Sequence, residues 1–122
     1  MADKESAILK NIMLALSKAG ARVFRNNSGY ATYPNGAVVK YGIANPGGSD
    51  CIGWHSIIIK PEDVGTRKAV FVAIEVKTEK GRLKPEQENF LNAVKKAGGY
   101  AGVATSPEQA LVLLTPTAST AP

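Results

Sequence analysis

Apolar residues repeat at helical spacing over residues 3–19. The stripe formed by this spacing consists of Ile8, Ile12, Leu16 and Ala19, with Leu9 and Met13 beside it. Asp3 is expected to cap the start of the helix, and Gly20 is expected to end it. The pattern therefore predicts an N-terminal helix that buries this stripe.

Two further helices are predicted in the last third of the chain. Residues 85–97 begin with Pro85, which suits the first position of a helix. The buried side of this helix is marked by Phe90, Leu91 and Val94. Ser106 and Gln109 have the spacing of a capping box, which predicts a short last helix.

Short apolar runs bounded by turn residues predict the strands. They are expected at residues 21–25, 37–43, from about 50 onward with 56–59 extending the apolar pattern, 69–77 and 101–105. Residues 26–36 are rich in Asn, Ser, Gly and Pro and are expected to form a loop. The order α-β-β-β-β-α-β-α predicts an α/β fold, with a central mixed β-sheet flanked by helices. We expect one domain over residues 1–114 and a flexible tail at 115–122.

Composition narrows the class of protein. The chain of 122 residues has 15 basic and 10 acidic side chains and a formal net charge of +5, which favours an anionic partner such as nucleic acid. One Cys and one His are too few for an internal disulfide or a Cys/His zinc site. No run approaches about 18 apolar residues, and the N-terminus lacks the apolar segment of a signal peptide. We expect a cytoplasmic protein without a membrane partner.

Charged residues interrupt the strand predicted at 69–77. Side chains alternate along a strand, so Glu75 and Lys77 share one face and emerge together at its C-terminal end. The opposite face, formed by Val70, Val72, Ile74 and Val76, is expected to lie in the core. One interpretation is an exposed ion pair. The other is a metal site, because Asp50, at the start of a neighbouring predicted strand, could join Glu75 as an oxygen ligand of Mg²⁺ or Mn²⁺.

The chain resembles the VRR-NUC family of the PD-(D/E)XK, or restriction-endonuclease-like, nucleases, which includes stand-alone phage and bacterial proteins. The matching segments are "VFRNNSG" (23–29), "GGSD" (47–50), "AIEVKTEKGRLKPEQENFL" (73–91) and "AGGYAGVATSPEQAL" (97–111). The resemblance implies that Asp50, Glu75 and the backbone carbonyl of Val76 bind Mg²⁺ or Mn²⁺. It also implies that Lys77 organises the attacking water and that Glu5, on the first helix, completes the acidic cluster. Ser49 stands where the superfamily has proline.

Gln87 has two interpretations. The resemblance places it near the catalytic site, whereas its spacing from Lys84 makes its amide a candidate cap for the second helix. Further candidates to contact DNA are Arg25, Asn26, Asn27, Lys80, Arg82 and Lys84. Ordinary turn chemistry is the alternative for the asparagines, and a solvated side chain is the alternative for Lys84. Tyr30, Tyr33 and Trp54 could stack on unpaired bases or, as is more common for aromatics near glycine-rich turns, could cover core edges.

The resemblance implies a metal-dependent DNA endonuclease that acts on branched DNA, as a Holliday junction resolvase does. Two symmetric cuts in a junction would require a homodimer, since one chain of this length holds one site. No organic cofactor is expected. Three alternatives stay open: a non-catalytic DNA-binding module on the same fold, a flap nuclease and a sequence-specific nuclease.

Overall fold

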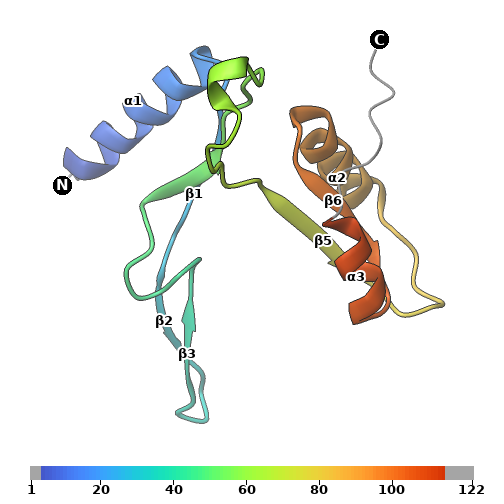
Figure 1. The fold of residues 1–122 in the computed structure, drawn as a ribbon. Helices are drawn as coiled ribbons and strands as arrows, with labels where there is room; N and C mark the ends of the chain where they lie inside the picture. The colour runs from blue at the N-terminus through green and yellow to red at the C-terminus, as the bar shows by residue number, and fades with distance from the viewer. Residues whose placement is uncertain (1–3, 115–122) are drawn as a thin grey trace. The chain divides into compact units, whose positions relative to one another are not determined.

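The computed structural model describes residues 4–114; the predicted Asp3 cap and the predicted tail at 115–122 lie outside the described residues. Figure 1 shows the elements in chain order. Their bounds are α1 Lys4–Lys18, β1 Arg22–Arg25, β2 Gly29–Thr32, β3 Val38–Tyr41, β4 Cys51–Trp54, the 3₁₀ turn η1 Pro61–Asp63, β5 Val72–Val76, α2 Pro85–Ala97, β6 Tyr100–Ala104 and α3 Pro107–Leu113. The chain divides into two compact units, the first ending at His55 and the second beginning at Ser56.

The first unit contains α1, which packs on β1, and β1 pairs with β4 as an antiparallel ladder. Phe24 lies opposite Ile52 in this ladder, and its ring centroid is 5.7 Å from that of Trp54. The Arg22 guanidinium lies 5.6 Å from the Trp54 ring centroid, within the range of a cation–π contact. Gly53 allows the two strands to approach, because a Cβ atom there would collide with the Arg22 carbonyl oxygen. An aromatic cluster therefore stabilises this ladder.

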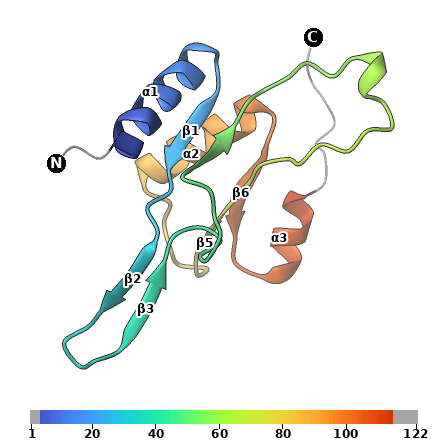
Figure 2. The same cartoon turned by 90° about the vertical axis from the view of Figure 1, so that its left-hand side faces the viewer.

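The first unit also contains an antiparallel hairpin of β2 and β3, which extends away from α1 and the β1–β4 ladder (Figures 1 and 2). The loop predicted at residues 26–36 therefore holds an additional strand, β2. Its four residues are bounded on both sides by turn-forming residues, so the sequence pattern does not distinguish this strand from the surrounding loop. The turn is closed by hydrogen bonds from the Tyr33 N–H to the Ala37 carbonyl at 2.8 Å and from the Gly36 N–H to the Tyr33 carbonyl at 2.9 Å.

The second unit is built on two parallel strands, β5 and β6, which are joined through α2. α2 packs on both strands and α3 packs on β6. The buried apolar residues of this unit are Leu91, Val94, Ala101 and Ala104. Gly99 lies between α2 and β6. A Cβ atom at this position would be only 2.7 Å from the Phe71 carbonyl oxygen, so glycine allows the chain to pass close to residue 71 as it enters β6.

The predicted α/β class is confirmed, and the element order differs from prediction only by the additional strand. The described strands pair as three two-stranded ladders, β1–β4, β2–β3 and β5–β6, where the sequence predicts one central sheet. The three predicted helices are present, and Ser106 caps α3 by accepting the Gln109 N–H at 3.2 Å. The Gln109 side chain accepts from the Thr105 N–H, a different bond from the reciprocal one of a capping box. Among the described residues, no helix has the length and apolarity needed to cross a membrane.

The predicted buried faces are partly wrong. On α1 the half-buried apolar residues are Leu9 and Met13, while the predicted stripe at Ile8, Ile12 and Leu16 is exposed. Of the predicted core face on and just before β5, Val70, Val72 and Val76 are exposed, Val76 at 75%, whereas Ile74 is half-buried. α2 covers the opposite face of β5, which carries Ala73 and Glu75. Residues 56–59, which were expected to extend the strand, form none, and β4 ends at Trp54.

Candidate active site

Glu75 and Lys77 lie together at the C-terminal end of β5, as the alternation of the strand predicts. The Lys77 Nζ atom is 3.6 Å from Glu75 Oε2, and the side chains are 18% and 32% exposed, respectively. The Lys77 N–H donates to the Ala104 carbonyl at 3.1 Å, which extends the β5–β6 pairing to the end of the site. The regular ladder thus fixes the backbone that carries the two charged groups.

Gln87 caps α2 and also contacts Glu75, while its role in catalysis stays a prediction. Its Oε1 accepts the Lys84 backbone N–H at 2.9 Å, which caps α2, and its Nε2 donates to Glu75 Oε2 at 3.1 Å. A primary amide has one acceptor end and one donor end, so the cap determines which end faces Glu75. The helix start therefore orients a hydrogen-bond donor onto the carboxylate of the neighbouring strand.

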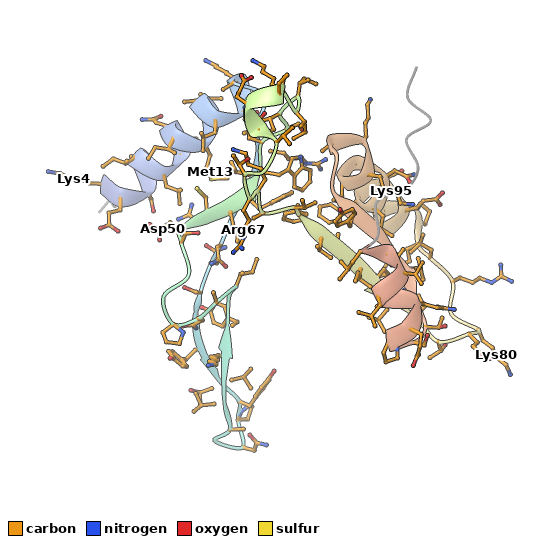
Figure 3. The ribbon with its side chains drawn as sticks, viewed as in Figure 1. Lys4, Met13, Asp50, Arg67, Lys80 and Lys95 are labelled. Atoms are coloured by element: carbon orange, nitrogen blue, oxygen red, sulfur yellow. The ribbon has the colours of Figure 1, made fainter. Side chains whose placement is uncertain are left out.

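Asp50 precedes β4 at the end of a glycine-rich turn in the first unit. Its backbone carbonyl accepts the Asn26 N–H at 2.8 Å, which continues the β1–β4 ladder by one residue. Its side chain lines a cavity of about 380 Å³ together with Glu5 from α1. The other lining residues are Ile8, Leu9, Ile12, Ser49 and Cys51. Figure 3 labels Asp50 beside the start of β4.

Asn26 holds the turn before Asp50 in place. Its side chain is 9% exposed; Nδ2 donates to the carbonyls of Ile43 at 3.0 Å and Ser49 at 2.9 Å, and Oδ1 accepts the Ile43 N–H at 2.8 Å. Both N–H groups and the oxygen of the amide bond to the backbone. Asn26 therefore positions the turn before Asp50, and its contact with DNA stays a prediction. The sequence gives no signal for this positioning role beyond an asparagine directly after a strand.

The donors in this cavity suit a hard divalent cation. Two carboxylates, from Glu5 and Asp50, line one cavity, and oxygen donors of this kind are preferred by Mg²⁺ and Mn²⁺. Within residues 4–114, no group of three or more His, Cys, Asp or Glu side chains is close enough together to hold a metal ion. The cavity therefore supplies part of the ligand set that the resemblance implies.

The predicted catalytic residues fall into two groups. Glu75, Lys77 and Gln87 come together in the second unit, and Glu5 and Asp50 come together in the first. Each group is described within its own unit, so the Asp50–Glu75 pairing stays a prediction. The side chain of Val76 points to the exposed face of β5, where the sequence predicts core.

The remaining predicted DNA-contacting residues are on the surface. Arg25 and Asn27 are exposed at the end of β1, and Arg25 Nη2 donates to Ser6 Oγ at 3.3 Å. The three basic residues Lys80, Arg82 and Lys84 are exposed between β5 and α2. Figure 3 shows Lys80 at the outer end of this loop. The basic loop directly connects the strand of Glu75 and Lys77 to the helix of Gln87.

The charged side chains of the first unit are mostly positive. Residues 6–49 contain no Asp or Glu and five basic side chains. These are Lys10, Lys18, Arg22, Arg25 and Lys40. Acidic side chains occur only on either side of this stretch, at Glu5 and Asp50 among the described residues of the unit. Such a surface favours an anionic partner.

Comparison with known proteins identifies the family. Residues 9–108 match the model of the VRR-NUC domain, a range that includes Asp50, Glu75, Lys77 and Gln87 and begins after Glu5. Neither the curated proteins nor the solved structures include a match. Because the family model covers most of the chain, including parts of both units, the protein belongs to the VRR-NUC family of nuclease-like, DNA-acting domains.

Proposed function

We propose that the protein is a divalent-metal-dependent endonuclease that hydrolyses phosphodiester bonds in branched DNA. The observation that carries this proposal is the cluster of Gln87, Glu75 and Lys77, in which an amide and an ammonium group both contact one carboxylate oxygen. An ordinary ion pair on the surface would not need the helix-capping Gln87 to hold its carboxylate by a hydrogen bond. The family match adds that the domain is nuclease-like.

Asp50, Glu75 and the Val76 carbonyl are the proposed metal ligands, with Glu5 assisting from α1. If these residues held Mg²⁺ or Mn²⁺, the cation would supply positive charge near the phosphate and would lower the pKa of a bound water. Lys77 orients the water for attack on phosphorus and stabilises charge on the phosphate. The bond from phosphorus to one sugar oxygen breaks as the bond to the water oxygen forms; the sugar oxygen keeps the electron pair and takes a proton from solvent, and the attacking water loses its proton to solvent. Gln87 keeps the Glu75 carboxylate in place during the reaction.

The proposed substrate is branched DNA, in particular a four-way junction. The family resemblance supports this choice, and the acid-free stretch of residues 6–49 supports an anionic substrate in general. Resolution of a junction takes two symmetric cuts, so we propose a two-fold homodimer as the active form. A protein that acts only on flaps would need a single site and could act as a monomer.

A cleavage assay tests the proposal. The intact chain should cut a four-way junction faster than a flap or a linear duplex in Mg²⁺ or Mn²⁺ and should be inactive in EDTA. Lys77→Ala should bind the junction as the original chain does and should lose cleavage. Retained cleavage by Lys77→Ala would contradict the mechanism, and equal cutting of all three DNAs would contradict the proposed substrate. Binding without any cleavage by the original chain would favour the non-catalytic DNA-binding module.

A further inference from the structure

The β2–β3 hairpin is anchored at its base by asparagine side chains. Asn45 Nδ2 donates to the carbonyls of Gly29 at 3.0 Å and Tyr41 at 2.8 Å, one on each strand. Asn26 holds both backbone groups of Ile43, shortly after β3 ends. A hairpin of two short strands has marginal stability by itself. These side-chain bonds hold the ribbon in a defined direction from its base.

One face of the hairpin carries an aromatic ring beside a cation. Tyr30 lies directly opposite Lys40 in the antiparallel register, and Thr32 lies opposite Val38, so all four side chains share a face. Tyr30 is 62% exposed, and Lys40 and Val38 are exposed as well. The other face carries Tyr41, whose ring lies over Gly29: a Cβ atom at Gly29 would be 2.7 Å from the Tyr41 hydroxyl oxygen.

The charge and shape of this face fit a strand of nucleic acid. If a second copy of the protein docked on this face through its own residues 6–49, it would offer no carboxylate to pair with Lys40. A phosphate group of DNA would supply the negative charge that Lys40 needs. An exposed tyrosine ring can stack on the face of a base, a contact that favours single strands. In a duplex the base faces are covered by neighbouring bases, so the Tyr30 ring would have no base face on which to stack.

We propose that the Tyr30–Lys40 face of the hairpin binds an unpaired strand of the DNA, with Tyr30 stacked on a base and Lys40 on an adjacent phosphate. This inference rests on the proposed action on DNA and adds a contact with an unpaired strand, which a four-way junction offers only where its branch point opens. An unpaired strand occurs at a flap or an opened branch point. The hairpin would select DNA with such a feature over a continuous duplex, in addition to the contacts at the cleavage site.

The test is the binding of fluorescent DNA to the full chain in EDTA, measured by anisotropy. The two DNAs are a duplex with a single-stranded arm and a blunt duplex of equal length. Tyr30→Ala should weaken binding to the first about 5- to 140-fold, the range that corresponds to loss of one aromatic–base stack, and to the second less than about 2-fold. Tyr30→Phe keeps the ring and should bind as the original chain does. Val39→Ala, at an exposed position on the opposite face of the hairpin, is the matched control and should leave binding unchanged.

Several results would overturn the proposal. These are unchanged binding of Tyr30→Ala to the DNA with the arm, equal losses on both DNAs, and a change in sedimentation mass without a change in binding. Unfolding in urea, measured for each variant, shows whether Tyr30→Ala alters the fold. If Tyr30→Ala loses much stability while Tyr30→Phe does not, the test is made with Lys40→Ala instead. Lys40→Ala must then weaken binding to the duplex with the single-stranded arm. Cleavage by Glu75→Gln in Mg²⁺ is scored separately. Retained cleavage there refutes the catalytic assignment and leaves the hairpin result standing.

Discussion

Replacing Gln87 by alanine removes two contacts at once, the cap of α2 and the hydrogen bond to Glu75. Loss of a side-chain cap costs about 1 kcal/mol. The bond to Glu75 adds about 0.5–1 kcal/mol, near the lower end for a hydrogen bond because the carboxylate is partly exposed and water can replace the amide. The free energy of unfolding should therefore fall by about 1.5–2 kcal/mol. Cleavage should fall further, about 10- to 100-fold, the usual cost of losing a group that orients a metal ligand.

Gln109 provides the matched control for this prediction. It occupies the same position in α3 as Gln87 does in α2, and its Oε1 accepts from the Thr105 N–H at 2.7 Å, but none of its hydrogen bonds goes to a carboxylate. Gln109→Ala should lose similar stability in urea unfolding and keep cleavage. Gln87→Glu keeps an acceptor for the Lys84 N–H and replaces the donor to Glu75 with a like charge, so it should keep the cap and lose cleavage. If Gln87→Ala cleaves DNA normally, or Gln109→Ala loses as much activity, the Gln87–Glu75 contact does not support catalysis.

Three further outcomes follow from the contacts. Asn26→Ala should lower the free energy of unfolding by about 2–4 kcal/mol, because three buried hydrogen bonds are lost. Asn27→Ala is the exposed control, and an equal loss of stability in that variant would contradict the role of the buried Asn26 amide. Gly53→Ala should destabilise the protein by about 1–3 kcal/mol through the collision of its Cβ with the Arg22 carbonyl, and unchanged urea unfolding would refute that close approach. Lys80→Ala should reduce the slope of log affinity for DNA against log salt concentration by about 0.9, and an unchanged slope would mean that Lys80 contacts no phosphate.

The helices were predictable because their signals are local. Pro85 at the start of α2 and Gly98 after its end appear in the sequence, and Gly98 has the positive φ of 103° that favours glycine. The pairing of Glu75 with Lys77 was equally accessible, since it follows from the alternation of one strand. These features depend on neighbours a few residues away.

The parts that the sequence did not predict depend on distant neighbours. β5 has apolar residues on both faces, so its pattern alone could not show that α2 covers the face of Ala73 and Glu75. The hydrogen bonds of Asn26 reach Ile43 and Ser49, which are 17 and 23 residues further along the chain. The cap at Gln87 could be predicted from spacing, whereas its second bond to Glu75 required the packing of α2 on β5.

The central proposal is that one divalent cation is held by the carboxylates of Asp50, directly before β4, and Glu75, on β5. The most direct measurement is anomalous diffraction from a crystal of the full chain soaked in Mn²⁺. We predict a peak within bonding distance of both the Asp50 and the Glu75 carboxylates, with the Lys77 ammonium group beside it. A peak that contacts only one of these carboxylates, or occupied Mn²⁺ sites that avoid both of them, would contradict the account.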